Sequence, residues 1–178
     1  MVATKSPKNS FNDLLQHLEQ QRPDIAFKQG RSFSWSPKNT TITYGKSTAV
    51  ESMWSLLHEF AHAELNHTTY TTDFELLTLE VAAWEACKKT AQDIDIIIDE
   101  VHIEDCLDSY RDWLHRRSTC PTCGSTGLQR TETEYHCHNC YSFWRVSAAR
   151  FCRPYRRKLT KAVDSQQSRS ARSGSTFQ

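Results

Sequence analysis

The sequence has no long apolar run. It contains no stretch of about 18 apolar residues, which is the length that a membrane-spanning helix requires. The longest candidate, residues 94–101, is short and contains acidic side chains. A secretory leader, with a basic start and an apolar centre, is also lacking. We therefore expect a soluble, cytoplasmic protein that does not contact a membrane.

The number of cysteines is odd, which does not suit a framework of disulfides within the chain. There are seven, so they cannot all pair within the chain, and four of them have the spacing of metal ligands. This usage favours a reducing compartment. The 178 residues are enough for one principal domain and a small second one.

Net charge is also small, at +1, but the charge is unevenly distributed. Residues 147–178 contain eight basic side chains and one acid, which amounts to +7, so the first 146 residues carry −6. We call residues 147–178 the basic tail and expect its distal part to be disordered. The basic tail is either a solubilising terminus or a segment that contacts nucleic-acid phosphates.

One motif indicates a catalytic metal. His58 and His62 are four residues apart in an apolar, helix-compatible stretch, so their side chains project from one helix face. Two imidazoles in this arrangement can share one Zn²⁺. Glu59, which follows the first histidine, is then placed to take a proton from metal-bound water. The motif predicts a zinc hydrolase.

Two histidines leave a catalytic zinc one protein ligand short. Downstream acids on a second, antiparallel helix can supply it. We favour Glu80, with Glu85 and Asp73 as alternatives. Glu85 also fits a solvated acid that pairs with a nearby lysine. On a continuous helix His67 points about 140° away from His62, so we expect it to lie at the helix C-terminus instead of binding the metal.

Patterning predicts an α+β fold for residues 10–118. A helix capped by Ser10 comes first. Strands within 26–35 and 40–44 then form a small antiparallel sheet with a turn at Gln29-Gly30. The motif helix follows over 47–66, capped by Ser47 or Thr48, and two further helices cover 74–92 and 98–117. This is the arrangement of a minimal zincin-like domain, with the ligand helix after the motif helix.

Residues 119–146 carry a second metal signature. Cys120 and Cys123 form one C-x-x-C knuckle, and Cys137 and Cys140 form another after thirteen intervening residues. Two such knuckles predict a structural zinc site with four thiolates, a zinc ribbon. A segment this small buries little apolar surface, so the metal supplies much of its stability.

The function of the ribbon is open. Tyr141, Phe143, Trp144 and Arg145 follow the second knuckle and form either the miniature core or a surface that stacks nucleic-acid bases. We favour the core. From about residue 148 to 163, the basic tail also has apolar residues at helical spacing, which allows a short helix.

Several stretches resemble the ImmA/IrrE-like metallopeptidases over about residues 25–92. They are Ser34-Trp-Ser-Pro, Thr41-Ile-Thr-Tyr44, Leu56-Leu-His-Glu-Phe-Ala-His-Ala-Glu-Leu-Asn-His67 and Glu80-Val-Ala-Ala-Trp84. The resemblance implies a small sheet before the motif helix and a second helix that supplies Glu80. Ala82 departs from the family pattern, which has a second glutamate there. The resemblance also implies that strand 40–44 offers an edge to an extended substrate.

SprT-like proteins, the second family considered, also join this motif to a zinc ribbon. Their third ligand is a histidine before glycine, but residues 68–101 contain no histidine and the chain has no His-Gly. We therefore expect a peptidase with one catalytic and one structural zinc, a protein or peptide substrate and Glu59 as the base. The alternative is an adaptor that binds DNA or RNA through its ribbon and basic tail with little or no catalysis.

Overall fold

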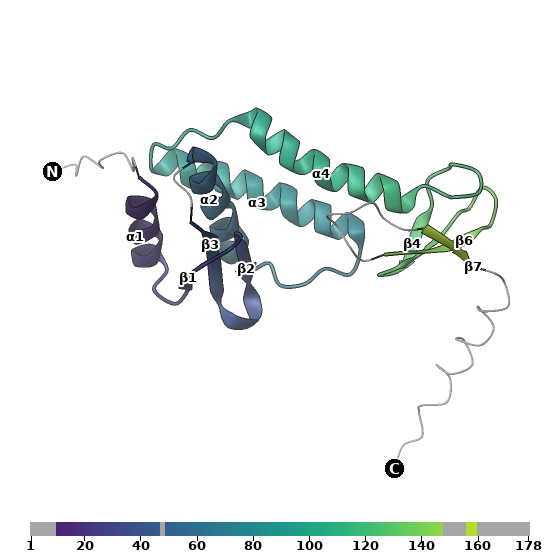
Figure 1. Ribbon diagram of the computed structural model, residues 1–178, viewed down its shortest axis with the longest axis horizontal. Helices are drawn as coiled ribbons and strands as arrows, with labels where there is room; N and C mark the ends of the chain where they lie inside the picture. The colour runs from purple at the N-terminus through teal and green to yellow at the C-terminus, as the bar shows by residue number, and fades with distance from the viewer. Residues whose placement is uncertain (1–9, 47–48, 148–155, 160–178) are drawn as a thin grey trace, which may run out of the picture. The chain divides into compact units, whose positions relative to one another are not determined.

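The computed structural model describes residues 10–46, 49–147 and 156–159 of the chain (Figure 1). It is an α+β structure, as predicted. The chain divides into two compact units, the first comprising residues 1–70 and 75–108 and the second residues 71–74 and 109–178. The second unit thus takes in more of the chain than the ribbon segment 119–146 that we expected.

The first unit opens with helix α1, Phe11–Gln21, which begins where the sequence predicts. The Ser10 hydroxyl caps it by accepting a hydrogen bond from the Asp13 backbone N–H at 3.2 Å. Leu14 and Leu18, one turn apart, are fully buried. Pro23 follows the last turn and prevents the helix from continuing.

A three-stranded sheet follows, with the order β1-β3-β2. Strand β2, Ser34–Ser36, pairs antiparallel with β3, Thr41–Gly45, across the 3₁₀ turn η1, Pro37–Asn39. Strand β1, Ala26–Gly30, runs parallel to β3. The prediction of an antiparallel sheet is therefore wrong for this pair.

The error comes from the turn expected at Gln29-Gly30. Both residues continue β1 and pair with Tyr44 and Gly45. Glycine is needed at position 30 because an added Cβ would lie 2.4 Å from Thr43 Cγ2. Since β1 does not turn back there, the chain crosses to the other side of β3. Strand β3 is thus central, and the sheet edges are β1 and β2.

Helix α2, Val50–Glu64, carries the His-Glu-x-x-His motif. It begins later than predicted. Its N-cap is Ala49, which has no side-chain oxygen that could accept a hydrogen bond from the first turn. The expected caps Ser47 and Thr48 lie outside the described residues. The helix is buried over most of its length, with Leu56, Leu57 and Phe60 fully excluded from solvent.

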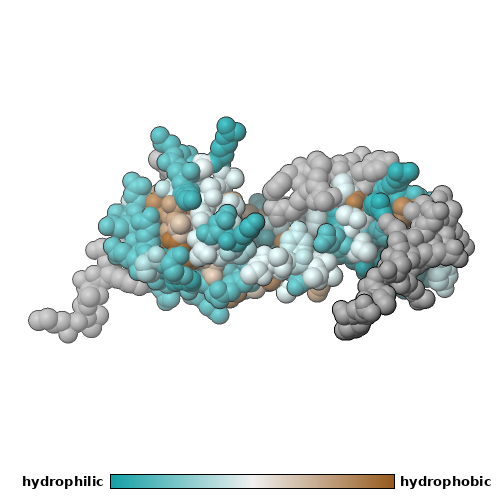
Figure 2. All heavy atoms as spheres, turned by 90° about the horizontal axis from the view of Figure 1, so that it is seen from below, coloured by the Kyte–Doolittle hydropathy of each residue, from teal (hydrophilic) through white to brown (hydrophobic). Residues whose placement is uncertain are grey.

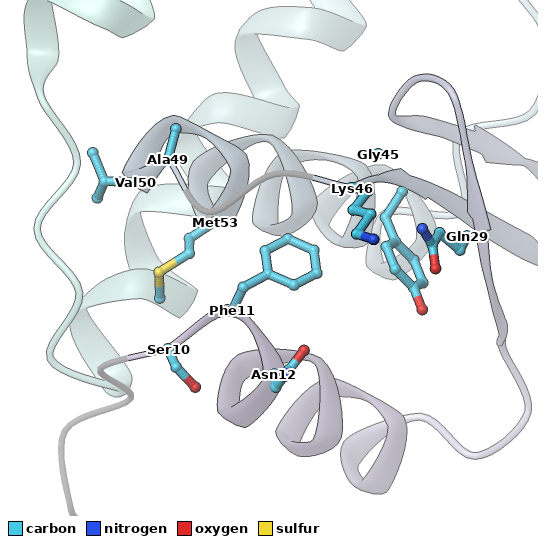
Figure 3. Close-up of a pocket in the computed structure, with 10 residues that line it drawn as sticks. Ser10, Phe11, Asn12, Gln29, Gly45, Lys46, Ala49, Val50 and Met53 are labelled. Carbon is cyan, nitrogen blue, oxygen red and sulfur yellow. The ribbon is translucent and has the colours of Figure 1, made fainter.

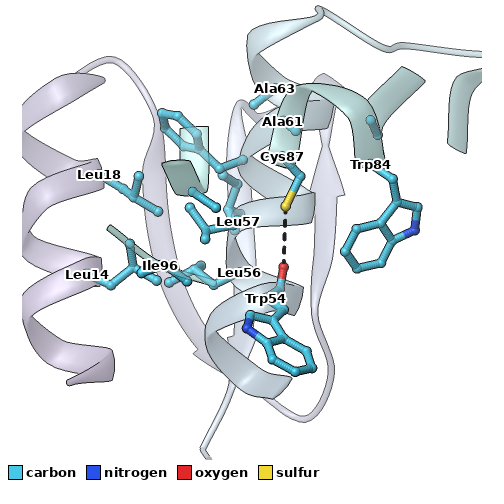
Figure 4. Close-up of a cluster of buried hydrophobic side chains, with 14 of the residues drawn as sticks. Leu14, Leu18, Trp54, Leu56, Leu57, Ala61, Ala63, Trp84, Cys87 and Ile96 are labelled. Carbon is cyan, nitrogen blue, oxygen red and sulfur yellow. Dashed lines mark hydrogen bonds between the residues drawn. The ribbon is translucent and has the colours of Figure 1, made fainter. Parts of the chain in front are cut away.

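Helices α3, Asp73–Asp93, and α4, Glu100–Ser118, complete the fold, and their parts in the first unit close its core. Figure 4 shows Leu14 and Leu18 of α1 facing Leu56 and Leu57 of α2. The Cys87 thiol of α3 lies 3.9 Å from the Trp54 carbonyl oxygen. Burial raises the pKa of Cys87 to about 12, so this thiol is protonated and unreactive.

The second unit contains a four-stranded antiparallel sheet, β4-β5-β6-β7. Its strands are β4, Leu128–Thr131; β5, Glu134–His136; β6, Phe143–Val146; and β7, Arg156–Leu159. Strand β7 comes from the basic tail, where the spacing of apolar residues allowed a short helix. Residues 148–155 and 160–178, including the part expected to be disordered, lie outside the description. The buried core consists of Cys120, Tyr135, Cys137, Trp144 and Val146.

A buried ion pair joins three segments of the second unit. Arg117 of α4, 2% exposed, donates from Nε and Nη2 to the two carboxylate oxygens of Asp73. The Tyr135 hydroxyl also donates to Asp73. Burial, and then the hydrogen bond to Asp73, raise the pKa of Tyr135, which keeps this donor protonated. Arg117 further donates to the backbone carbonyls of Glu132 and Ser147.

The exterior is mostly polar on the face drawn in Figure 2, where apolar residues form only small separate areas outside the parts covered in grey. Within the described ranges, no helix is long and apolar enough to cross a membrane. The apolar side chains instead gather in the two buried clusters.

Candidate metal centres

Three side chains meet at the first candidate centre. His58 and His62 project from one face of α2, and Glu80 reaches them from α3. His58 Nε2 lies 3.1 Å from Glu80 Oε2 and 3.1 Å from His62 Nε2. The third separation, from His62 Nε2 to Glu80 Oε2, is 3.6 Å. The three donor atoms thus face one point, and the group can hold a metal ion.

The structure separates the three acids that the sequence left open. Glu80 is buried and belongs to the cluster. The Glu85 side chain is 59% exposed, and its Oε1 lies 2.7 Å from Lys88 Nζ, as expected of a solvated acid. Asp73 is buried in the ion pair with Arg117 in the second unit. Only Glu80 of these three is brought to the histidines.

Electrostatics keep Glu80 ionised. Burial by itself raises the pKa of this carboxyl, but hydrogen bonds with His58 and His62 outweigh it, so the pKa lies below its ordinary value. His58 stacks on Trp84 of α3, with ring centroids 4.2 Å apart and planes inclined by 29°. The stacked indole fixes the orientation of the imidazole, while His58 Nδ1 is buried without a hydrogen-bond partner in the described part of the chain.

His67 is a site residue that the sequence reasoning missed. Its Nδ1 lies 2.8 Å from Nδ1 of His62, the ring nitrogen on the far side from the cluster. His67 lies just beyond the C-terminal end of α2, as expected. Because α2 ends at Glu64 and Asn66 takes a positive φ of 52°, the chain turns there and the His67 ring reaches His62. Trp35 Nε1 then holds the His67 carbonyl at 2.9 Å.

This contact orients His62. A histidine that binds metal through Nε2 usually donates its Nδ1–H to a fixed acceptor, which sets its tautomer and ring orientation. His67 can accept that hydrogen bond only while it is neutral. Burial, together with the neighbouring His62, lowers the pKa of His67 and favours the neutral form.

We expect His67→Ala to weaken metal binding at this centre by about 10- to 100-fold, the usual cost of losing such a partner. Competition with a chromophoric chelator measures the affinity. His17→Ala in α1 is the control, because His17 belongs to neither metal cluster. Unchanged affinity in His67→Ala would show that the contact does not orient His62.

Glu59 lies next to the cluster on α2. Its Oε2 accepts a hydrogen bond from the Trp35 backbone N–H of β2 at 2.7 Å. Burial raises the pKa of Glu59, although His58, His62 and the Trp35 hydrogen bond oppose the increase. The group is therefore a stronger proton acceptor than an exposed carboxylate, and one of its oxygens is held in place.

The four predicted cysteines form the second candidate centre, within the second unit. Sγ of Cys120 lies 3.6 Å from Sγ of Cys140, and Sγ of Cys123 lies 3.5 Å from Sγ of Cys137. Hydrogen bonds with Ser125, and then with Asn139, lower the pKa of Cys123 to about 5. The four sulfurs can hold a metal ion, and thiolate is the form that binds.

The backbone after each knuckle adopts the left-handed region. Gly124 has φ 75°, which a glycine adopts freely. Tyr141, at the equivalent place after Cys140, has φ 58° although it is not glycine. The turn after the second knuckle therefore sets the direction of an exposed tyrosine.

The open pocket in Figure 3, of about 870 Å³, is a separate feature. The first residues of α1 and α2 and the ends of β1 and β3 line it, with Phe11 projecting across it and Lys46 at its wall. No residue of either metal cluster is among its lining residues. The chemistry of the chain is thus concentrated at the two clusters rather than in this pocket.

Comparison of the chain with protein-family models, with curated proteins and with solved structures finds no match. The geometry of the two clusters is therefore the basis for the function proposed below.

Proposed function

We propose that the chain is a zinc-dependent peptidase of zincin-like fold. His58, His62 and Glu80 would hold the catalytic zinc, with Glu59 as the proton acceptor, and Cys120, Cys123, Cys137 and Cys140 would hold a structural zinc. The observation that carries the proposal is the triangle of two imidazole nitrogens and one carboxylate oxygen beside the half-buried Glu59 carboxylate. The resemblance of residues 25–92 to ImmA/IrrE-like metallopeptidases agrees with it.

The separations fit zinc at both centres. Zn–N and Zn–O bonds of about 2.0–2.1 Å place two ligands of a tetrahedron about 3.3 Å apart, and the triangle has sides of 3.1, 3.1 and 3.6 Å. Zn–S bonds of about 2.3 Å predict sulfurs about 3.8 Å apart, close to the 3.5 and 3.6 Å between the cysteines. Three protein ligands leave a fourth position open, whereas four thiolates close the site.

The roles of the side chains follow from their positions. A bound zinc would polarise the scissile carbonyl and acidify a water molecule. Glu59 takes a proton from the attacking water, which adds to the carbonyl carbon. The same carboxyl then gives the proton to the amine as the C–N bond breaks. Its raised pKa favours the first transfer, and the hydrogen bond from the Trp35 N–H holds one oxygen of the carboxylate in place.

The sheet favours an extended peptide as substrate. The expected edge at residues 40–44 is wrong, because β3 is the central strand. Strand β2 is an edge, and its Trp35 N–H points to Glu59 instead of pairing with β3. A peptide added beside β2 would have its backbone next to Glu59, which is how strand addition presents a chain.

Glu59→Gln tests the proposal. With the zinc-loaded chain and a mixed peptide library, we expect wild type to cleave peptides and Glu59→Gln to lose at least about 100-fold in rate, because general-base catalysis contributes 10²–10⁴. Mass spectrometry of the products measures the rate. Elemental analysis should still find two zinc ions per chain, in agreement with one open and one closed site.

Matched glutamates provide the controls. Glu85→Gln, on the same helix as Glu80, should keep both the cleavage rate and the zinc content. Glu80→Gln should lose one zinc ion and the activity together. No cleavage by a wild type that holds both zinc ions, or equal rates in wild type and Glu59→Gln, would contradict a peptidase and favour a non-catalytic adaptor.

A further inference from the structure

The ribbon sheet separates residues that are adjacent in the sequence onto opposite faces. Along β6, Trp144 and Val146 are buried in the core, so Phe143 and Arg145 point to the other face. The sequence reasoning treated Phe143 and Trp144 as one group. Strand alternation divides them: Trp144 builds the core, and Phe143 does not.

Register brings further side chains to the face of Phe143. His136 of β5 pairs with Phe143, and Arg157 of β7 pairs with Arg145. Residues directly opposite each other in antiparallel strands project from the same face. We define the ribbon's outer face as His136, Phe143, Arg145 and Arg157 together with Arg130 of β4 and the exposed Tyr141.

Aromatic rings on the outer face are already ordered. His136 stacks on Phe143, with centroids 4.2 Å apart and planes inclined by 10°. The Arg130 guanidinium lies 5.0 Å from the centroid of the Phe143 ring. Tyr141 is 68% exposed, and its ring lies 6.2 Å from His136. Rings held in place before binding lose little entropy when a further planar group stacks beside them.

The charges of the outer face favour an anion. Arg130, Arg145 and Arg157 are all exposed there. Glu134, on the same face, is paired with Arg145 at 2.6 Å. Planar stacking groups among arginines match a single-stranded nucleic acid, because each nucleotide has a flat base for the ring and a charged phosphate for the guanidinium.

We propose that the ribbon's outer face binds single-stranded nucleic acid, with a base stacked on Tyr141 and phosphates held by Arg130 and Arg157. Single strands fit because duplex bases are stacked on each other and do not offer their faces. This binding is independent of the proposed hydrolysis. The left-handed backbone at Tyr141, set by the Cys140 knuckle, turns the stacking ring outward.

Fluorescence anisotropy with the full, zinc-loaded chain tests this proposal. The probes are labelled oligothymidylate and oligouridylate of about twelve nucleotides, and a duplex of equal length. We expect both single strands to bind at least tenfold more tightly than the duplex. The two single-stranded probes also determine whether DNA or RNA is preferred.

Two variants locate the site. Tyr141→Asn removes the ring and keeps a residue that tolerates positive φ, and it should weaken binding about five- to hundredfold. Arg130→Gln should weaken binding and lower the slope of log affinity against log salt by about 0.7. The control is Arg116→Gln, an exposed arginine of α4 outside the outer face. The basic tail is the same in all of them.

Three results would overturn the proposal. The first is absence of binding by wild type. The second is equal weakening by Arg116→Gln and Arg130→Gln with no effect of Tyr141→Asn, which is binding by charge alone. The third is that Tyr141→Asn weakens the binding of an acidic peptide but does not weaken the binding of either oligonucleotide. Zinc content and thermal melting of each variant verify that the ribbon is folded.

Discussion

Arg117→Met should destabilise the second unit by about 3–5 kcal/mol, the usual cost of leaving one partner of a buried ion pair uncompensated. The substitution leaves the Asp73 carboxylate buried with only uncharged donors, Tyr135 and Gln129. It also removes the donor to the Glu132 and Ser147 carbonyls. Few surface or core substitutions in a domain of this size reach such values.

Urea unfolding measures this effect, with tryptophan fluorescence as the signal because Trp144 and Trp113 both contact Arg117. Arg116→Met is the matched control. Its side chain is 49% exposed and its pair with Asp112 spans 3.9 Å, so its loss should change stability by less than about 0.5 kcal/mol. A loss below about 1 kcal/mol in Arg117→Met would show that the pair contributes little.

The ion pair also involves the first residue of helix α3. Asp73 is the first residue of α3, and Glu80 lies seven residues later in the same helix. The backbone N–H of Asp73 also donates a hydrogen bond to Gln129 Oε1 at 2.7 Å. Residues of the second unit thus hold the first residue of α3 in place.

Removing the zinc ion proposed for the four cysteines should unfold the ribbon. The buried core there has five residues, two of them cysteines, and so little apolar surface cannot compensate the entropy of ordering the strands. Structural zinc supplies about 10–16 kcal/mol in comparable small sites at neutral pH. Cys137→Ser, in a fully buried position, should therefore lose one zinc ion and the ribbon fold together.

Exposure of Trp144 would report the loss, as a red shift of tryptophan emission and rapid exchange of β5 and β6 amides. Cys106→Ser is the control, because Cys106 belongs to neither metal cluster and both zinc ions should remain. Protected β5 and β6 amides after zinc removal would mean that apolar packing and the Asp73–Arg117 pair suffice to hold the sheet.

Short-range chemistry was readable from the sequence. The spacing of His58 and His62, the two C-x-x-C knuckles and the Ser10 cap each depend on residues within about one helical turn or one tight turn. Such geometry follows from local backbone rules. The positions of these residues in the structure agree with what their spacing predicts.

Predictions failed where a local pattern had two outcomes. Gln29-Gly30 reads as a turn, but glycine also suits a strand whose neighbour fills the Cβ position, as Thr43 does. Thr43 lies outside the local window around Gly30. The sequence also did not show that His67 contacts His62, because that contact depends on where α2 ends and on the positive φ of Asn66.

By itself, the sequence therefore determined the ligand pairs, the knuckles and the α+β class, because periodicity and turn chemistry act between near neighbours. Only the tertiary structure decided that Glu80 and not Glu85 or Asp73 joins the histidines, that His67 holds His62, and that Phe143 and Trp144 serve different faces. These choices depend on how helices and strands pack. Packing is set by burial and charge pairing summed over segments that are distant in the chain, such as Asp73 with Arg117.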